Sequence, residues 1–165
     1  MRRILSSFAV ALTVLAFTAA VAFAAVNWKA GPDVTFNGTT SATATGEASG
    51  LGNQPAIATL EVEGTVTYTC RNKGGNEAPG QNPVPATGTG TQDLGNSDHN
   101  GRGELNITVS LDAPAPEVNG KVAGCPNGNW KGVNPVSSGI LSATLTITQG
   151  GQVIYGPVTF DNPNN

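Results

Sequence analysis

The sequence predicts an all-β domain, an antiparallel β-sandwich with one disulfide, on three observations. Apolar and polar residues alternate over long segments, which is typical of strands with one buried and one solvated face. Clusters of Gly, Asn, Ser and Pro separate these segments and form turns. No window combines helical periodicity with capping residues, so almost no helix is expected. About seven to nine antiparallel strands at this spacing favour a sandwich.

The clearest predicted strand covers residues 56–70. Gly64 interrupts its apolar series and indicates a bulge or bend. Because Cys70 shares the parity of the buried face, we expect its sulfur to point into the interior. The apolar parity carries Ala58, Leu60, Val62, Val66, Tyr68 and Cys70, and the polar parity carries Thr and Glu residues, including Glu61 and Glu63.

Residues 104–112 and 141–149 repeat this alternation. The side chains expected to face inward are Leu105, Ile107, Val109 and Leu111 in the first segment, and Leu141, Ala143, Leu145 and Ile147 in the second. Gly150-Gly151 predicts a tight hairpin turn into a strand at 152–155, because glycine adopts the positive φ that such turns need. Weaker patterns predict strands at 33–37, 39–48, 84–92 and 156–160. The pattern is immunoglobulin-like only in general architecture, since Trp130 follows the second cysteine instead of lying between the two.

Residues 1–24 have the features of a secretory signal peptide. Arg2 and Arg3 precede an uncharged, mainly apolar run, and Ala22-Phe23-Ala24 fits the small-residue cleavage pattern. Cleavage there leaves a single secreted domain with short flexible ends, residues 25–165, in an extracellular location. The alternative is a retained anchor, because the apolar run is long enough to span a bilayer.

Composition narrows the function classes. Removing the signal takes two basic residues and no acidic ones, so the formal net charge moves from −3 to −5. The remaining basic residues are scattered and form no stripe, which argues against nucleic acid as a partner.

Few aromatic residues are present for a core, so a covalent cross-link is valuable. Cys70 and Cys125 are the only cysteines, and in an oxidising compartment we expect them to pair.

Each cysteine lies beside a loop of turn-forming residues. Cys70 opens a loop that runs to Pro83, in which Pro79-Gly80 fits a type II turn, and Cys125 lies in the loop 122–130. A disulfide between them places both loops at one end of the sandwich. The loops are then either strand connections or a rigid binding end. The candidate binding residues are Asn76, Gln81, Asn82, Asn127, Asn129 and Trp130.

Trp28 and Trp130 are the candidates for an exposed aromatic platform that stacks on sugar rings. Each has a structural alternative. Trp28 follows the signal segment and is an edge or terminal residue in that reading. Trp130 packs over the disulfide in the alternative that we favour, so that its truncation opens a cavity.

The loop motifs carry a resemblance to a known group of proteins. The turn GLGNQ at 50–54, the strand end TYTC at 67–70, GNEAPGQNP at 75–83 and GCPNGNW at 124–130 resemble small exported proteins from Gram-positive bacteria, chiefly actinobacteria. The resemblance covers most of the chain after the signal segment. It implies a secreted all-β domain, and it implies no activity and no site residues.

Catalytic and metal-binding patterns are weak. Ser97-Asp98-His99 places three triad residue types side by side, but a catalytic triad is assembled from residues that converge in space. The connection 93–104 has the composition of a calcium loop without EF-hand spacing, so a calcium ion there stays an alternative to a polar loop. Its candidate ligands are Asp93, Asp98, Asn100 and Glu104. We expect no cofactor and no transition-metal site.

The sequence therefore predicts a secreted, non-enzymatic protein that binds or assembles at the cell surface or in the medium. The expected partner is a cell-surface polymer, a glycan or another protein, and a membrane only if the signal segment is retained. The alternative is a carbohydrate-binding or protease-inhibitor-like module that uses the disulfide-linked loops. A hydrolase is the least favoured class, because it needs a cleft with converging acidic groups.

Overall fold

The computed structural model describes residues 25–95 and 101–164, and the signal segment predicted at 1–24 lies outside these ranges. The described part is all-β and contains no helix, as predicted. Its nine strands are β1 (Asn27–Asn37), β2 (Ser41–Ser49), β3 (Ala56–Arg71), β4 (Glu77–Pro79), β5 (Val84–Asp93), β6 (Gly103–Ser110), β7 (Glu117–Asn119), β8 (Lys131–Gln149) and β9 (Gln152–Asp161). Within the same ranges, no helix is long and apolar enough to cross a membrane.

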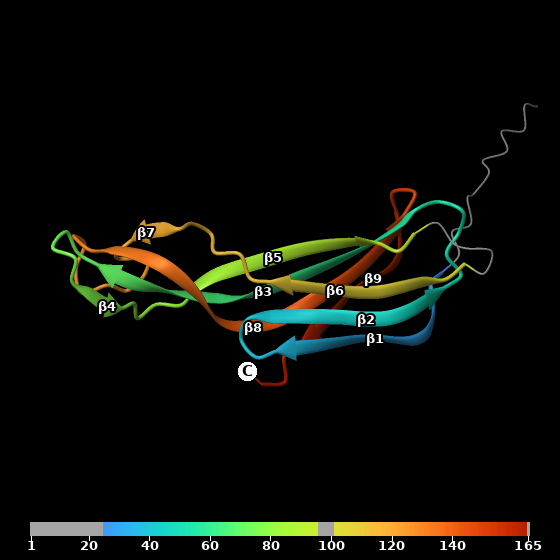
Figure 1. Cartoon of the computed structure of the whole chain (residues 1–165), viewed down its shortest axis with the longest axis horizontal. Helices are drawn as coiled ribbons and strands as arrows, with labels where there is room; N and C mark the ends of the chain where they lie inside the picture. The colour runs from blue at the N-terminus through green and yellow to red at the C-terminus, as the bar shows by residue number, and fades with distance from the viewer. Residues whose placement is uncertain (1–24, 96–100, 165) are drawn as a thin grey trace, which may run out of the picture.

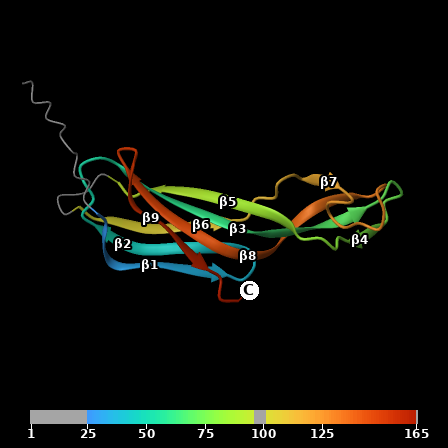
Figure 2. The same ribbon diagram turned by 180° about the vertical axis from the view of Figure 1, so that it is seen from behind.

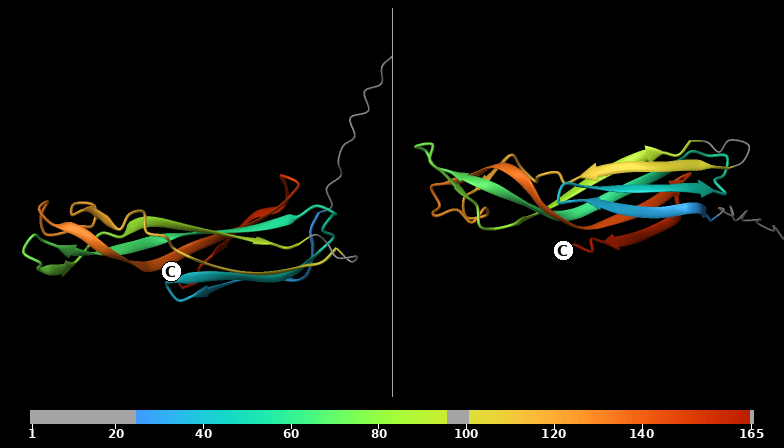
Figure 3. Two further views of the ribbon diagram at one scale, coloured as in Figure 1. Left: turned by 45° about the horizontal axis from the view of Figure 1, so that its top comes forward. Right: turned by 60° about the horizontal axis from the view of Figure 1, so that its bottom comes forward.

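The strands form two antiparallel sheets (Figures 1 and 2). The first has the order β1-β2-β6. The second is built on the long strands β3 and β8, flanked by β5 and β9 along one part of their length and by β4 and β7 along the other. Figure 3 shows the three-stranded sheet beside the first part only, while β3 and β8 run on past it. We call the two-layered part the body, and the projecting end, residues 67–83 and 113–138, the tip.

The core of the body is formed by the side chains of alternate strand residues, which face inward from both sheets. Leu60 and Leu145 are fully buried, and each contributes about 1.5–3 kcal/mol by leaving water. The two facing sheets share one cluster of buried side chains, so the predicted β-sandwich is confirmed. The cluster includes Ala42, Ala44, Leu105, Ile107 and Val109 from the first sheet, and Ala58, Leu60, Val62, Ala143, Leu145 and Ile147 from the second.

One predicted core residue is wrong. Leu141 is 50% exposed, whereas its neighbour Ile140 is fully buried. The cause is a bulge in β8, because Glu63 pairs with Ser142 and the next residue, Gly64, pairs with Ile140. The extra residue turns Leu141 outward, since a shift of one position exchanges the two faces of a strand. The bulge predicted at Gly64 is confirmed.

On one side of the sandwich, a single side chain joins the two sheets. Gln92 of β5 donates its Nε2–H to the carbonyl oxygen of Glu104 (3.0 Å) and accepts the backbone N–H of Asn106 on its Oε1 (2.8 Å). The amide thereby satisfies two backbone groups on the free edge of β6. These groups would otherwise be open to pairing with another strand.

Aromatic rings close the opposite side, between the edge strands β1 and β9. Trp28 packs edge-on against Tyr155, with ring centroids 5.2 Å apart and an interplanar angle of 78°. Trp28 also lies against the body core, and a Cβ atom on Gly46 would lie 2.7 Å from its Cζ3. Trp28 therefore belongs to the core side of β1. The prediction that Trp28 is an edge residue is confirmed, because β1 is an edge strand, and the alternatives of an exposed stacking platform and a loose terminal residue are wrong.

Both edge strands on this side interrupt their ladders at a Gly-Pro pair. The β1–β2 register shifts on either side of Ala30, next to Gly31-Pro32, and the β8–β9 register shifts where Gly156-Pro157 lies. Proline has no N–H to donate to an added strand. Interrupted edges of this kind disfavour edge-to-edge pairing with another chain.

Candidate functional site

The tip is packed around a second cluster of buried residues, which extends into the adjoining part of β3 and β5 and contacts the body core through Leu111. Its buried residues include Tyr68 and Cys70 of β3 and Ala123 of the loop between β7 and β8. Cys125, Val118 and Trp130 pack against this cluster. The Cys70–Cys125 disulfide, with Cα atoms 5.6 Å apart, connects the end of β3 to that loop. The predicted pairing, the inward direction of Cys70 and the meeting of the two loops at one end are all confirmed.

Close packing in the tip explains why strand β8 begins ten residues before the predicted segment at 141. Gly132, Pro135 and Gly139 are turn-forming residue types, so no strand was predicted for this segment. In the structure, a Cβ atom on Gly132 would lie 2.7 Å from the Cβ of Ala123 and 2.8 Å from Cγ2 of Val118. The glycine is therefore needed for a tight approach between the strand and the loop, and not for a turn.

The type II turn predicted at Pro79-Gly80 is wrong. Pro79 ends strand β4, and the N–H of Gly80 donates to the carbonyl oxygen of Tyr68 at 2.8 Å. Gly80 is not among the glycines with positive φ, which a type II turn requires. The chain instead reverses at residues 72–76, where Gly75 has a φ of 81° and donates its N–H to the carbonyl oxygen of Asn72.

Asparagine side chains hold the tip loops in shape. The Oδ1 atoms of Asn72, Asn119 and Asn127 each accept the backbone N–H two residues further on, at 2.9 to 3.0 Å. Such Asx turns satisfy backbone groups that no strand ladder reaches. Together with the disulfide, they make the loops a rigid surface.

The six predicted binding residues separate into two groups. Asn129 and Trp130 line a hollow on the surface of the tip. Asn127 supports that hollow from behind, because its side chain accepts the N–H of Asn129. Gln81 and Asn82 instead bond within their own loop and to the carbonyl oxygen of Lys121, and Asn76 lies in the 72–76 turn. None of these three residues lines the hollow.

The hollow, which we call the tip cleft, lies between the loop after β3 and strand β7. It consists of two adjoining depressions of about 460 and 190 Å³ that share Lys73, Glu117, Asn129 and Lys131. Trp130 is partly buried, and it both packs against the tip core and lines the larger depression. The residues of the tip cleft used below are Lys73, Glu117, Asn119, Asn129, Trp130 and Lys131.

Two ion pairs lie at the tip. Lys131 Nζ lies 2.5 Å from Glu117 Oε1 across the β7–β8 pair, and Arg71 Nη2 lies 2.6 Å from Glu77 Oε1 across the β3–β4 pair. All four side chains are about half-exposed, and pairs this exposed contribute about 0–1 kcal/mol to stability. Each of these four side chains can therefore exchange its present partner for a charged group of a ligand.

The charged residues of the cleft were not predicted as site residues. A signal was present, because Arg71, Lys73, Lys121 and Lys131 all lie within six positions of one of the two cysteines. Once the disulfide is assigned, these cations must meet at one place. Treating them as scattered was therefore wrong.

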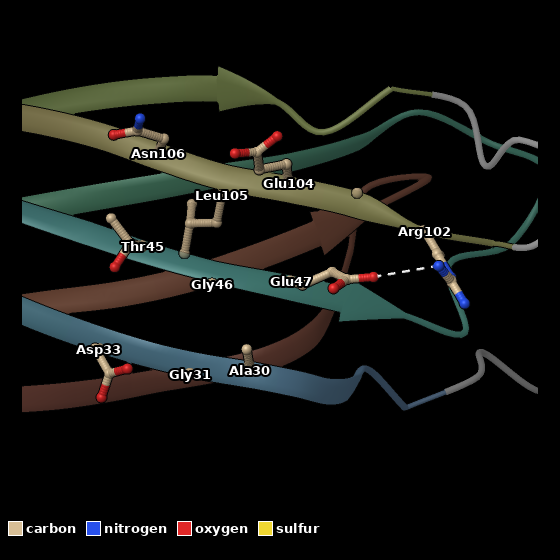
Figure 4. A pocket seen from close by; sticks show the side chains of 11 residues that line it. Ala30, Gly31, Asp33, Thr45, Gly46, Glu47, Arg102, Glu104, Leu105 and Asn106 are labelled. Atoms are coloured by element: carbon tan, nitrogen blue, oxygen red, sulfur yellow. Dashed lines mark ion pairs between the residues drawn. The ribbon is translucent and has the colours of Figure 1, made fainter.

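A second hollow lies in the body, over the three-stranded sheet (Figure 4). It measures about 510 Å³ and is lined by Asp33, Thr45, Glu47, Glu104 and Asn106 among others. Arg102 pairs with Glu47 at 3.6 Å at one end of it. This sheet hollow holds no aromatic side chain.

The predicted metal and catalytic motifs can be compared with the described residues only in part. No group of three or more His, Cys, Asp or Glu residues within 25–95 and 101–164 is placed to hold a metal ion. The carboxylate of Asp93 accepts the N–H of Gly95 at 2.8 Å and so caps its own turn. Two of the candidate calcium ligands, Asp98 and Asn100, and the Ser97-Asp98-His99 motif lie outside the described residues. The calcium alternative stays a prediction.

Comparisons of the chain with protein-family models, with curated proteins and with solved structures gave no match. The resemblance to exported actinobacterial proteins therefore stays a prediction, and the site has to be judged on its own geometry.

Proposed function

We propose that the protein is exported and acts outside the cell as a non-enzymatic binding protein, with the tip as its recognition end. The observation that carries this proposal is the separate construction of the tip. Two long strands project it beyond the sandwich, and a disulfide and its own core hold its loops around the tip cleft. Rigid loops on a scaffold are the usual place for binding residues. Preorganised loops also lose little entropy when a partner binds.

The position of the tip in the molecule supports the same proposal. Strand β1 begins at the end of the body furthest from β4 and β7 (Figure 1). If the segment before residue 25 is kept as an anchor, the tip points away from the membrane. If the segment is cleaved, the tip remains the most projecting part of a released protein.

The chemistry of the cleft favours binding over catalysis. The cleft is lined by one carboxylate, Glu117, and this group is paired with Lys131. General acid and base catalysis by carboxylates needs two of them in different environments. The interrupted edges of β1 and β9 also favour recognition through the tip over assembly by strand pairing.

A steric test separates the tip from the sheet hollow. Gly128 lines the tip cleft, its φ is not positive, and a Cβ atom there would meet only Lys121 Cε at 3.7 Å. Gly128→Trp therefore fills the cleft without changing charge or straining the backbone. Asn106→Trp is the matched control, because it places the same bulk over the sheet hollow.

Labelled protein is mixed with intact cells of the producing organism, and the bound fraction is measured after sedimentation. We expect Gly128→Trp to lose binding and Asn106→Trp to bind like the wild type. Loss of binding in Asn106→Trp with retention in Gly128→Trp would place recognition on the body and overturn the proposal. Circular dichroism and melting of both variants check that each is folded.

A further inference from the structure

Charge is segregated along the long axis of the molecule. The tip holds four basic residues, Arg71, Lys73, Lys121 and Lys131, and two acidic ones, Glu77 and Glu117, for a net charge of +2. The described part of the body holds two basic residues, Lys29 and Arg102, and has a net charge of −6. Its acidic residues are Asp33, Glu47, Glu61, Glu63, Asp93, Glu104, Asp112 and Asp161. An acidic protein thus presents a basic end.

The basic residues are arranged around the tip cleft. Lys73 and Lys131 line both depressions, and Arg71 lines the smaller one. Lys121 lies at the rim, with its Cε 3.7 Å from the Cβ position of Gly128. Lys131 and Arg71 have carboxylate partners, and among the described residues Lys73 and Lys121 form no ion pair. Lys73 and Lys121 therefore give the cleft positive charge that no carboxylate among the described residues neutralises.

The remaining lining suits a sugar. Asn119 and Asn129 are exposed amides that both donate and accept hydrogen bonds, as hydroxyl groups require. Trp130 lines the larger depression beside them and also packs against the tip core, so an aromatic side chain is held at this place. A flat apolar surface flanked by amides is the combination that pyranose rings need, and the lysines add a preference for negative charge.

We propose that the tip cleft binds an acidic polysaccharide, one whose sugar units carry carboxylate or phosphate groups. This inference rests on the proposed function and names the class of partner. The acidic body limits contact to the tip, because a polyanion is repelled by both sheets. The contact is accordingly short and its affinity for a single site low, and repetition along the polymer raises the apparent affinity.

A second copy of the chain fits the tip less well. The acidic residues of the body are divided between the outer faces of two sheets, with Glu61 and Glu63 on one and Glu47 and Glu104 on the other. The outer face of the three-stranded sheet gathers Asp33, Glu47 and Glu104 around the sheet hollow, but Arg102 pairs with Glu47 there and reduces the negative charge. Sedimentation of the protein alone tests this occupant, and we expect a monomer at micromolar concentration.

The binding test uses three polymers with one backbone: carboxymethyl dextran, dextran phosphate and unmodified dextran. Binding is followed by fluorescence in a Trp28→Phe background, in which Trp130 is the only tryptophan. Lys73→Glu is the test variant, because Lys73 lines the cleft and forms no ion pair among the described residues. Lys29→Glu is the matched control, since it changes the net charge equally at the start of β1 in the body.

We expect at least one acidic dextran to change the Trp130 emission and unmodified dextran to leave it unchanged. Which acidic dextran binds distinguishes carboxylate from phosphate recognition. At an ionic strength of about 0.1 M, Lys73→Glu should weaken binding about tenfold and Lys29→Glu by less than about twofold, because charges further apart than the Debye length of about 10 Å are largely screened. Raising the salt concentration should weaken binding of the wild type.

Three results would overturn the inference. They are equal binding of neutral and acidic dextran, equal loss in Lys29→Glu and Lys73→Glu, and tighter binding of a thymidine oligonucleotide than of either acidic dextran. Either of the first two results would show that the cations of the cleft do not determine binding. The third would identify a nucleic acid as the preferred partner. If Gly128→Trp abolishes cell binding while Lys73→Glu does not, the proposed recognition through the tip is supported. The proposal of an acidic polysaccharide as the ligand is then contradicted.

Discussion

Gly132 lies so close to Ala123 that a Cβ atom on the glycine would be 2.7 Å from the alanine Cβ. This contact joins strand β8 to the disulfide-bearing loop. Gly132→Ala should overpack the tip core and lower the free energy of unfolding by about 1–3 kcal/mol, as measured by urea denaturation. Gly128→Ala is the matched control, because the Cβ position of Gly128 is open. Equal stability of the two variants would show that the tip core tolerates the extra methyl group.

The disulfide closes a 55-residue separation, which corresponds to about 4 kcal/mol of stabilisation in the chain-entropy model. The double variant Cys70→Ser, Cys125→Ser should therefore lose about 2–5 kcal/mol in urea unfolding. The loss should fall first on the tip, since Cys70 and Cys125 both belong to the tip core. Hydrogen exchange should show faster exchange at the tip-side ends of β3 and β8 than in the body. A uniform increase over the whole chain would contradict a separately packed tip.

Trp130 is only half-buried, so its truncation should affect both stability and binding. Complete burial of a tryptophan corresponds to a loss of about 3–5 kcal/mol on truncation to alanine. For Trp130→Ala we expect roughly half of that range, and a loss of polymer binding as well. The melting temperature and the fluorescence titration of a dye-labelled protein measure the two effects. An unchanged melting temperature would mean that Trp130 is a surface residue without a structural role.

Burial raises the pKa of the Tyr155 phenol above its ordinary value of 10.0. The unfolded chain therefore loses this proton at lower pH than the folded protein does. As the pH rises through about 10, ionisation favours the unfolded state, so the free energy of unfolding falls. Urea denaturation at pH values of about 9 and 11 should show a larger loss for the wild type than for Tyr155→Phe. Equal losses in the two proteins would contradict a raised pKa of the Tyr155 phenol.

The sequence was most informative where one rule decided the structure. In residues 56–70, alternation alone identified the strand, its buried face and the bulge at Gly64. The two cysteines left one intramolecular pairing, and the Gly150-Gly151 hairpin followed from the positive φ that both residues adopt. The strand and the hairpin follow from local patterns, and the disulfide follows because two cysteines allow only one intramolecular pair.

The sequence failed where tertiary packing overrode local preference. Gly132 and Pro135 have the composition of a loop, and yet they lie in β8 because β3 and β7 pair with it. Gly80 was predicted to form a turn. The position requires glycine for another reason, because the carbonyl oxygens of Tyr68 and Ala123 approach within 2.5 and 2.7 Å of its Cβ position. The tip cleft was not predicted for a related reason, although the basic residues near the two cysteines were a signal for it. Its lysines come from segments far apart in the chain, and only the disulfide and the β3–β8 pairing bring them together.

The most direct test of recognition at the tip uses the two tryptophan indole signals in a nitrogen-15 correlation spectrum. Trp130 reports on the tip cleft, and Trp28 reports on the body, where it packs against Tyr155. The titrant is whichever acidic dextran binds, as short oligomers. We predict that the Trp130 indole signal shifts with increasing oligomer while the Trp28 signal stays in place. A shift of the Trp28 signal, or of the Asp33 and Asn106 amides, with Trp130 unchanged would contradict recognition at the tip.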